Sequence, residues 1–184
     1  GDSWAEQCRG RGYVLNTGNE ATLTGIMPEM NFKDGILLHR SQRVGIYAAY
    51  ATQSETGVYD IRTVTATNNV ISGCRFSISD TDPAGIMYLD NSDFNVISNN
   101  VFWLTSASDT GLTLSSGSDY NTITGNCFNE SGASVVGISD AGTGNSIIGN
   151  NFRLSGAGSD DMVISGAPSM TIPGTVIVGI GTDY

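Results

Sequence analysis

The chain has 184 residues, of which 39% are hydrophobic, so it is long enough for one folded domain and is not a disordered segment. Its formal net charge of −10 argues against nucleic acid and anionic membrane surfaces as partners, because both bind basic faces. No apolar run approaches the ~18 residues of a membrane-spanning helix, so no membrane insertion is expected.

Residues 1–56 are rich in short apolar segments but show no clear repeat. Residues 35–38 and 44–47 look like strands of less regular coils. We interpret this region as the first coils of a solenoid together with a cap, because an open coil end is an unpaired sheet edge. Trp4 or the segment around Cys8 could supply that cap.

Residues 57–165 contain a repeat, Asn-x-Ile-x-x-x-x-Phe, which is the strongest signal in the chain. Its copies begin at Asn69, Asn95, Asn121 and Asn145, so the spacing is 26, 26 and 24 residues. A second apolar segment recurs at residues 85–89, 111–114, 137–138 and 162–164. Apolar and polar residues alternate within each copy, which is typical of a strand with one buried face.

A single copy cannot bury its own apolar face, so the copies are expected to stack. We predict an all-β fold, a right-handed parallel β-helix of about six coils. The repeated Ile and Phe side chains then form ladders inside the tube, and Asn100, Asn126 and Asn150 form a ladder at a turn. The Leu-x-x-Leu-x-Leu pattern of leucine-rich repeats is missing, and the period is too short for propeller blades.

The same geometry predicts the state of the cysteines. Cys74 and Cys127 would lie two coils apart, about 9–10 Å along the axis, whereas a disulfide needs Cα atoms within about 7 Å. Both are expected to be free, buried thiols, and Cys8 lies outside the repeats. Residues 166–184 include an apolar stretch at 170–178 that breaks the pattern, and we expect it to form a last coil or a subunit contact.

The repeat resembles that of the pectin-lyase-like right-handed β-helices, and most closely the repeats shared by carbohydrate-binding proteins and sugar hydrolases. That group includes polysaccharide lyases, glycoside hydrolases, epimerases and trimeric bacteriophage tailspikes. Short length, abundant Gly, Ser, Thr and Asn, a single Lys and the apolar C-terminal segment resemble a tailspike or tail-fibre fragment.

The resemblance implies a homotrimer in the virion tail, or otherwise an extracellular protein, that contacts bacterial surface polysaccharide. A polysaccharide-degrading enzyme, either hydrolase or lyase, and a purely structural virion or adhesin stalk are the alternatives.

Two sets of residues suggest catalysis. Asp82 and Asp109 precede strands of neighbouring coils, where two carboxylates could stand the ~5–9 Å apart that glycoside hydrolysis requires. They could equally be turn residues. His39, Arg40 and Arg43 form a basic cluster that could serve a lyase as base and carboxylate-neutralising group, although ion pairs with the many acids explain it as well.

Aromatic residues suggest a glycan-binding surface. Phe94 and Tyr120 occupy equivalent positions in their copies; pointing outward they would form a strip for sugar rings, and pointing inward they would be core. Trp103 follows the inward Phe102, so alternation places it outside, facing sugar or another subunit, unless it is partly buried. Asp93 and Asp119 precede the aromatic pair, and either bind a bridging calcium ion or accept backbone N–H groups. No other metal or cofactor site is predicted.

Overall fold

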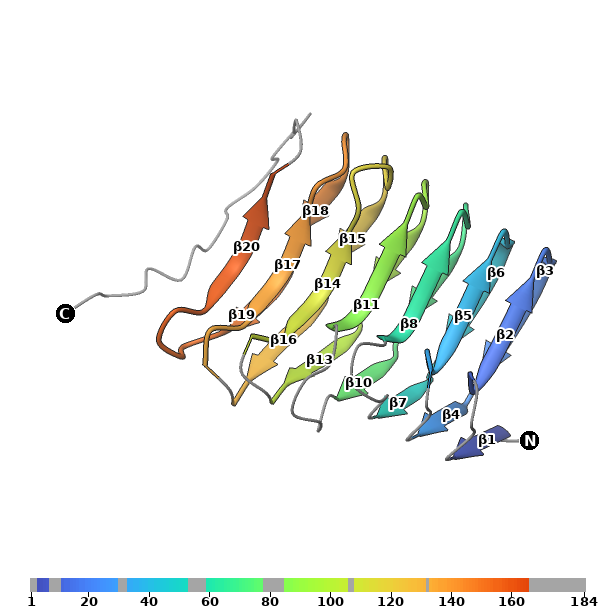
Figure 1. Ribbon diagram of the computed structural model, residues 1–184, viewed down its shortest axis with the longest axis horizontal. Coiled ribbons are helices and arrows are strands. Elements are labelled where there is room, and N and C mark those ends of the chain that lie inside the picture. The colour runs from blue at the N-terminus through green and yellow to red at the C-terminus, as the bar shows by residue number, and fades with distance from the viewer. Residues whose placement is uncertain are drawn as a thin grey trace.

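The computed structural model describes residues 3–6, 11–29, 33–52, 59–77, 85–105, 108–131 and 133–165. These residues form three parallel sheets that run the length of the molecule, and the chain visits each sheet once per coil (Figure 1). This is the predicted right-handed parallel β-helix. Two sheets have seven strands and one has six, in agreement with the expected number of coils.

The strands of each sheet are consecutive coils in register. Sheet A contains β1 (Ser3–Glu6), β4 (Ile26–Glu29), β7 (Tyr50–Thr52), β10 (Arg75–Ser77), β13 (Val101–Leu104), β16 (Cys127–Glu130) and β19 (Asn151–Arg153). Sheet B contains β2 (Tyr13–Asn16), β5 (Ile36–His39), β8 (Tyr59–Val64), β11 (Gly85–Asp90), β14 (Thr110–Leu114), β17 (Val136–Asp140) and β20 (Asp160–Ile164). Sheet C contains β3 (Asn19–Thr24), β6 (Gln42–Tyr47), β9 (Val70–Ser72), β12 (Val96–Ser98), β15 (Thr122–Thr124) and β18 (Ser146–Ile148).

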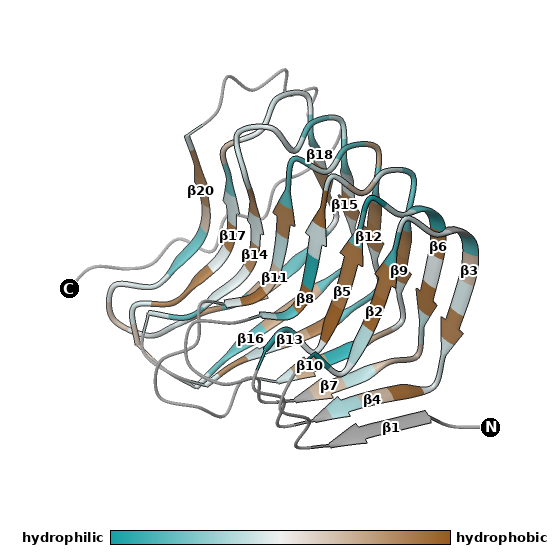
Figure 2. Cartoon of the chain, turned by 45° about the vertical axis from the view of Figure 1, so that its right-hand side comes forward, coloured by the Kyte–Doolittle hydropathy of each residue, from teal (hydrophilic) through white to brown (hydrophobic). Residues whose placement is uncertain are grey.

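The core consists of side-chain ladders along the tube, and Figure 2 shows hydrophobic bands that continue from strand to strand. The repeated isoleucines are paired in register on sheet C, as predicted: Ile71, Ile97, Ile123 and Ile147. The repeated phenylalanines are paired on sheet A, with ring centroids 5.2, 4.6 and 5.0 Å apart: Phe76, Phe102, Phe128 and Phe152. The Phe76–Phe102 pair is tilted and the other two pairs are stacked, and aromatic pairs at these distances stabilise the fold beyond simple burial.

Glycine makes room for the phenylalanine ladder. A Cβ atom on Gly111 would lie 2.9 Å from the ring of Phe128, and one on Gly137 would lie 2.7 Å from the ring of Phe152. Each would also approach a backbone oxygen of the next coil at 2.7 or 2.6 Å. The glycines of the repeat therefore let strands of sheet B pack closely over the rings.

Asparagine ladders hold two corners of each coil together. In the predicted ladder, the amide oxygens of Asn126 and Asn150 each accept the backbone N–H and the side-chain N–H of the asparagine one coil before, at 2.9–3.1 Å. The asparagines that begin each repeat form a second ladder with the same pattern, at 2.7–3.1 Å: Asn69, Asn95, Asn121 and Asn145. These bonds satisfy buried backbone groups that the strands leave unpaired at the corners.

Cys74 takes the asparagine position in its coil. It is 2% exposed, and its backbone N–H donates to the amide oxygen of Asn100 at 2.9 Å. Burial raises the pKa of its thiol to about 11. Both Cys74 and Cys127 are free, as predicted. The expectation that both are buried is wrong for Cys127, which is half-buried because it precedes the inward Phe128 and so faces out of sheet A.

The N-terminal strands continue the three sheets. Residues 35–38 and 44–47, expected to be coil strands, belong to β5 and β6 and pair in register with β8 and β9. Cys8, the side chain of Trp4 and residues 166–184 lie outside the described parts, so the cap, the C-terminal segment and the division at residues 56 and 165 stay predictions. Within the described ranges, no helix is long and apolar enough to cross a membrane.

Candidate functional site: three outer surfaces

Phe94 and Tyr120 project from the corner between sheets B and C, where each follows a strand of sheet B by a few residues. Their side chains are 54% and 56% exposed, so they point outward, as the glycan-strip alternative requires. The two rings stack with centroids 5.4 Å apart and an interplanar angle of 10°. We call these two residues the corner pair.

The corner pair has an unusual backbone conformation. Equivalent residues of six successive coils all have positive φ, between 55° and 69°: Glu20, Arg43, Asn68, Phe94, Tyr120 and Gly144. Gly and Asn suit this conformation, whereas a bulky residue in it costs of the order of 1–3 kcal/mol. The turn is therefore made in other coils without an aromatic residue, so turn formation does not explain why Phe94 and Tyr120 are there.

Asp93 and Asp119, beside the corner pair, accept hydrogen bonds from the backbone of the next coil. Asp93 Oδ1 accepts the N–H of Asp119 at 2.8 Å, and Asp119 Oδ1 accepts that of Thr143 at 2.7 Å. Of the two roles considered for Asp93 and Asp119, these bonds correspond to the acceptance of backbone N–H groups. In the described parts of the chain, no group of three or more His, Cys, Asp or Glu side chains is placed to hold a metal ion.

Trp103 lies on the outer face of sheet A, away from the corner pair. Its side chain is 36% exposed, which agrees with the outward direction predicted by alternation. The guanidinium carbon of Arg75 lies 5.7 Å from the centroid of the Trp103 ring and also 5.7 Å from that of Tyr50. The sequence predicted Trp103 but missed Tyr50 and Arg75, which complete this surface.

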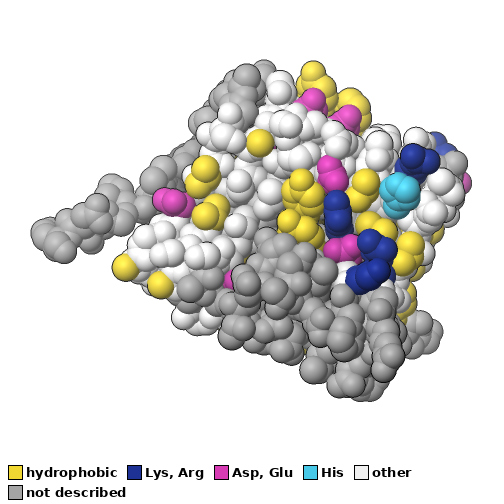
Figure 3. Space-filling model, in the orientation of Figure 1, with side chains coloured by type: hydrophobic (Ala, Val, Ile, Leu, Met, Phe, Trp, Pro, Cys, Tyr) yellow, Lys and Arg dark blue, Asp and Glu magenta, His cyan; other side chains and the backbone are white. Residues whose placement is uncertain are grey.

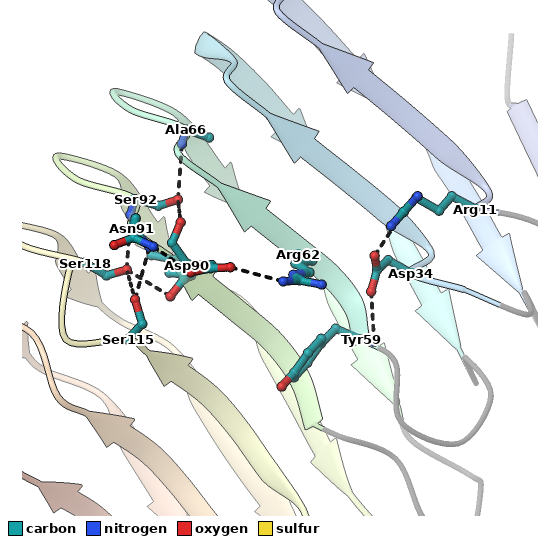
Figure 4. A network of polar contacts seen from close by, with 11 residues as sticks. Arg11, Asp34, Tyr59, Arg62, Ala66, Asp90, Asn91, Ser92, Ser115 and Ser118 are labelled. Carbon is teal, nitrogen blue, oxygen red and sulfur yellow. Dashed lines mark hydrogen bonds and ion pairs between the residues drawn. The ribbon is translucent and has the colours of Figure 1, made fainter.

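The outer face of sheet B carries a third surface, in its N-terminal half (Figures 3 and 4). The rings of Tyr59 and Tyr88 stack with centroids 4.9 Å apart, and the guanidinium of Arg62 lies 5.7 Å from the Tyr88 ring. Arg62 Nη2 also pairs with Asp90 Oδ2 at 3.1 Å. Burial, and then the neighbouring Tyr88, raise the pKa of Tyr59.

A second ion pair lies at the N-terminal side of this surface, between Arg11 Nε and the buried carboxylate of Asp34 at 3.0 Å. Arg62 of β8 and Arg11, just before β2, are thus each neutralised by a carboxylate of the next coil. The residues of this surface lie outside the Asn-x-Ile-x-x-x-x-Phe motif, so the repeat did not predict them.

The basic cluster expected at residues 39–43 is divided between sheets. His39, at the end of β5, has Nδ1 2.8 Å from Asn16 Oδ1. Arg43, in β6, forms an exposed ion pair with Glu20 at 3.0 Å. For Arg43, the explanation of the basic cluster by ion pairs with acidic residues is confirmed.

The structure describes only one of the two carboxylates considered for glycoside hydrolysis. Asp82 lies outside the described residues. Asp109 is 1% exposed and precedes β14 by one residue, in register with the buried Val135 of the next coil. A carboxylate buried to this degree is not open to solvent on the outer surface, and the catalytic pair stays a prediction.

Comparison with known proteins defines the family. The family model described as NosD, periplasmic copper-binding protein, matches residues 3–158, and the chain belongs to this family of parallel β-helices. A search of the curated proteins found no match. A similar solved structure is PfbA, a surface adhesin of Streptococcus pneumoniae, with a TM-score of 0.50 and 12% sequence identity. The similarity covers 93% of this chain and 64% of that one, and it supports the fold alone.

The residues present do not match the copper named in the family description. The chain has one histidine, His39, and its ring contacts Asn16. Cys74 is buried as a thiol of raised pKa, and Cys127 is two coils away on the outside of the tube. Copper sites combine several imidazole, thiolate or thioether ligands. In the described residues, no group of three or more His, Cys, Asp or Glu side chains could hold the ion.

Proposed function

We propose that this protein is a glycan-binding β-helix module that acts outside the cytoplasm and contacts bacterial surface polysaccharide. The corner pair is the observation that carries the proposal. Two large aromatic rings stand more than half exposed on consecutive coils, in a backbone conformation that disfavours bulky residues. Aromatic faces of this kind pack against the apolar faces of sugar rings.

Further aromatic surface lies on the sheets. Tyr50 and Trp103 on sheet A are 40% and 36% exposed. Since the coils repeat at ~4.8 Å, side chains on successive coils form regularly spaced platforms for a polymer made of repeating units. A long, repetitive ligand therefore suits this surface better than a small molecule, which favours a concave pocket.

The names of similar proteins support a location outside the cytoplasm. The family is described as periplasmic, and the similar solved structure is a surface adhesin. In its full form the proposal makes the chain part of a bacteriophage tailspike or tail fibre that works as a homotrimer. Its composition, with 24 glycines and a net charge of −10, is compatible with this role.

The test replaces the corner pair by the residues that neighbouring coils use at the same position. Phe94→Asn copies Asn68 and Tyr120→Gly copies Gly144, so the positive φ is preserved while both rings are removed. Binding to an array of purified bacterial polysaccharides should fall at least tenfold for the double variant. The control Val163→Thr removes an exposed apolar side chain of sheet B and should bind like the wild type.

Full binding by a correctly folded double variant would count against the corner pair as the binding surface. Light scattering on a size-exclusion column tests the tailspike form of the proposal separately. A species of three times the chain mass is expected, and a clean monomer would contradict it.

A further inference from the structure

The outer face of sheet A carries a strip of aromatic and cationic side chains that crosses five consecutive coils. It begins with Tyr50 on β7, continues with Arg75 on β10 and Trp103 on β13, and ends with Arg153 on β19. The strand pairing fixes this order: Arg75 is in register with Tyr50, while Trp103, Asn129 and Arg153 are in register with one another. We call these residues the sheet A strip.

Arg75 differs in its partners from three other arginines of the described residues. Arg11, Arg43 and Arg62 each pair with a carboxylate at 3.0–3.1 Å. Arg75 is exposed and has no ion pair within the described residues; its guanidinium instead lies between two aromatic rings, 5.7 Å from each. Cation–π contacts hold the group in place without occupying its N–H donors, which can therefore bind an anion.

Among the described residues of sheet A from β7 to β19, the charge is opposite in sign to that of the whole chain, whose net charge is −10. Between β7 and β19, the strands of sheet A carry Arg75, Arg153 and one carboxylate, Glu130. Glu130 is half-buried, and its Oε1 accepts the backbone N–H groups of Ser155 and Gly156. The strip is therefore positive on an otherwise acidic molecule, which favours an anionic ligand at this face.

We propose that the sheet A strip binds an acidic polysaccharide, with a sugar carboxylate on Arg75 and the adjacent sugar rings packed on Tyr50 and Trp103. This inference rests on the proposed glycan-binding function and names its substrate class. Guanidinium binds carboxylate through two parallel hydrogen bonds, so Arg75 discriminates a uronic acid from the neutral sugar of the same shape.

The spacing of the strip suits an extended chain. Tyr50 and Trp103 stand two coils apart, and Arg153 stands two coils beyond Trp103, which gives about 10 Å for each step along the axis. The two cations are thus separated by three coils, so acidic sugars that recur along a polymer can reach both. Arg153 is exposed and, like Arg75, forms no ion pair with another described residue.

The experiment compares acidic glycans with their neutral counterparts on the whole chain. A panel of purified bacterial capsular polysaccharides that contain uronic acids is used, each beside a carboxyl-reduced sample of the same polymer. Binding is measured by biolayer interferometry for the wild type, for Arg75→Gln and for Arg43→Gln. The last variant removes the same charge from an ion-paired arginine on sheet C and controls for net charge.

Arg75→Gln should weaken binding of the acidic polymers roughly tenfold to a hundredfold, as expected for loss of hydrogen bonds to a charged group. Binding of the reduced polymers should change less than twofold, and Trp103→Ala should weaken both. Equal affinity of Arg75→Gln and Arg43→Gln for the acidic polymers would overturn the inference while leaving the proposed function intact. A wild-type protein that binds no polymer of either kind would overturn both.

Discussion

Replacing Asn121 by alanine should destabilise the protein more than the small number of atoms removed suggests. Asn121 is 1% exposed and lies in the ladder that begins the repeats. Its Oδ1 accepts the backbone N–H of Asn95 at 2.8 Å and the Asn95 amide at 3.1 Å. Its Nδ2 donates to the carbonyl oxygen of Ser92 at 3.0 Å and to Asn145 Oδ1 at 3.1 Å.

The magnitude follows from the groups that lose a partner. The Asn95 amide keeps its bond to the Ala66 carbonyl oxygen at 3.0 Å, whereas the Asn95 backbone N–H and the Ser92 carbonyl oxygen each lose the bond to Asn121. A buried polar group left unsatisfied costs about 1–3 kcal/mol, so Asn121→Ala should lower the free energy of unfolding by about 2–5 kcal/mol. For a domain of this size, that is a fall of roughly 5–15 °C in Tm.

Urea unfolding followed by circular dichroism provides the measurement, with Asn151→Ala as the matched control. Asn151 lies on the exposed face of β19, so its replacement should cost less than about 0.5 kcal/mol. If Asn121→Ala loses less than about 1 kcal/mol, or no more than the control, the ladder does not stabilise the coils as argued.

Two further predictions concern the inside of the tube. Phe102 and Trp103 are neighbours on β13 but face opposite ways. Phe102→Ala should lower the free energy of unfolding in urea by about 3–5 kcal/mol, and Trp103→Ala by about 1 kcal/mol or less. A larger loss for Trp103→Ala than for Phe102→Ala would refute the register. Burial raises the pKa of Cys74 from 9.0 to about 11, so the protonated thiol stabilises the fold fully below pH 9, and this contribution is lost as the pH rises to about 11. Cys74→Asn, which copies the residue of the next coils, should not show this loss of stability between about pH 9 and about pH 11. An equal loss in both proteins would contradict the assignment.

The sequence predicted the fold because the repeated residues also determine the register. One Asn per coil marks each corner, and the alternation after it places Ile on sheet C and Phe on sheet A inside the tube. The same alternation placed Trp103 outside. The ladder at Asn100, Asn126 and Asn150 followed from the equivalent positions of these residues in consecutive copies.

The surfaces beyond the repeat were harder to predict for a physical reason. Tyr50 belongs to a coil in which Ala51 takes the core position that Phe76 has in the next coil, so the repeat pattern does not extend to it. Without that register, Tyr50 and Arg75 cannot be recognised as neighbours of each other. Asp109 follows a loop whose length differs between coils. The alternation of inward and outward residues in a strand cannot be extended across such a loop, so the burial of Asp109 was not predicted.

The proposal that the outside of this β-helix binds bacterial glycans is tested by measuring the binding of the wild-type chain to a panel of purified capsular and O-antigen polysaccharides. We expect binding to a subset of polymers that contain uronic acids, and this binding should be weakened by added salt because Arg75 and Arg153 contribute charge. Absence of binding to every polymer in the panel, by a protein shown to be folded, would contradict the claim.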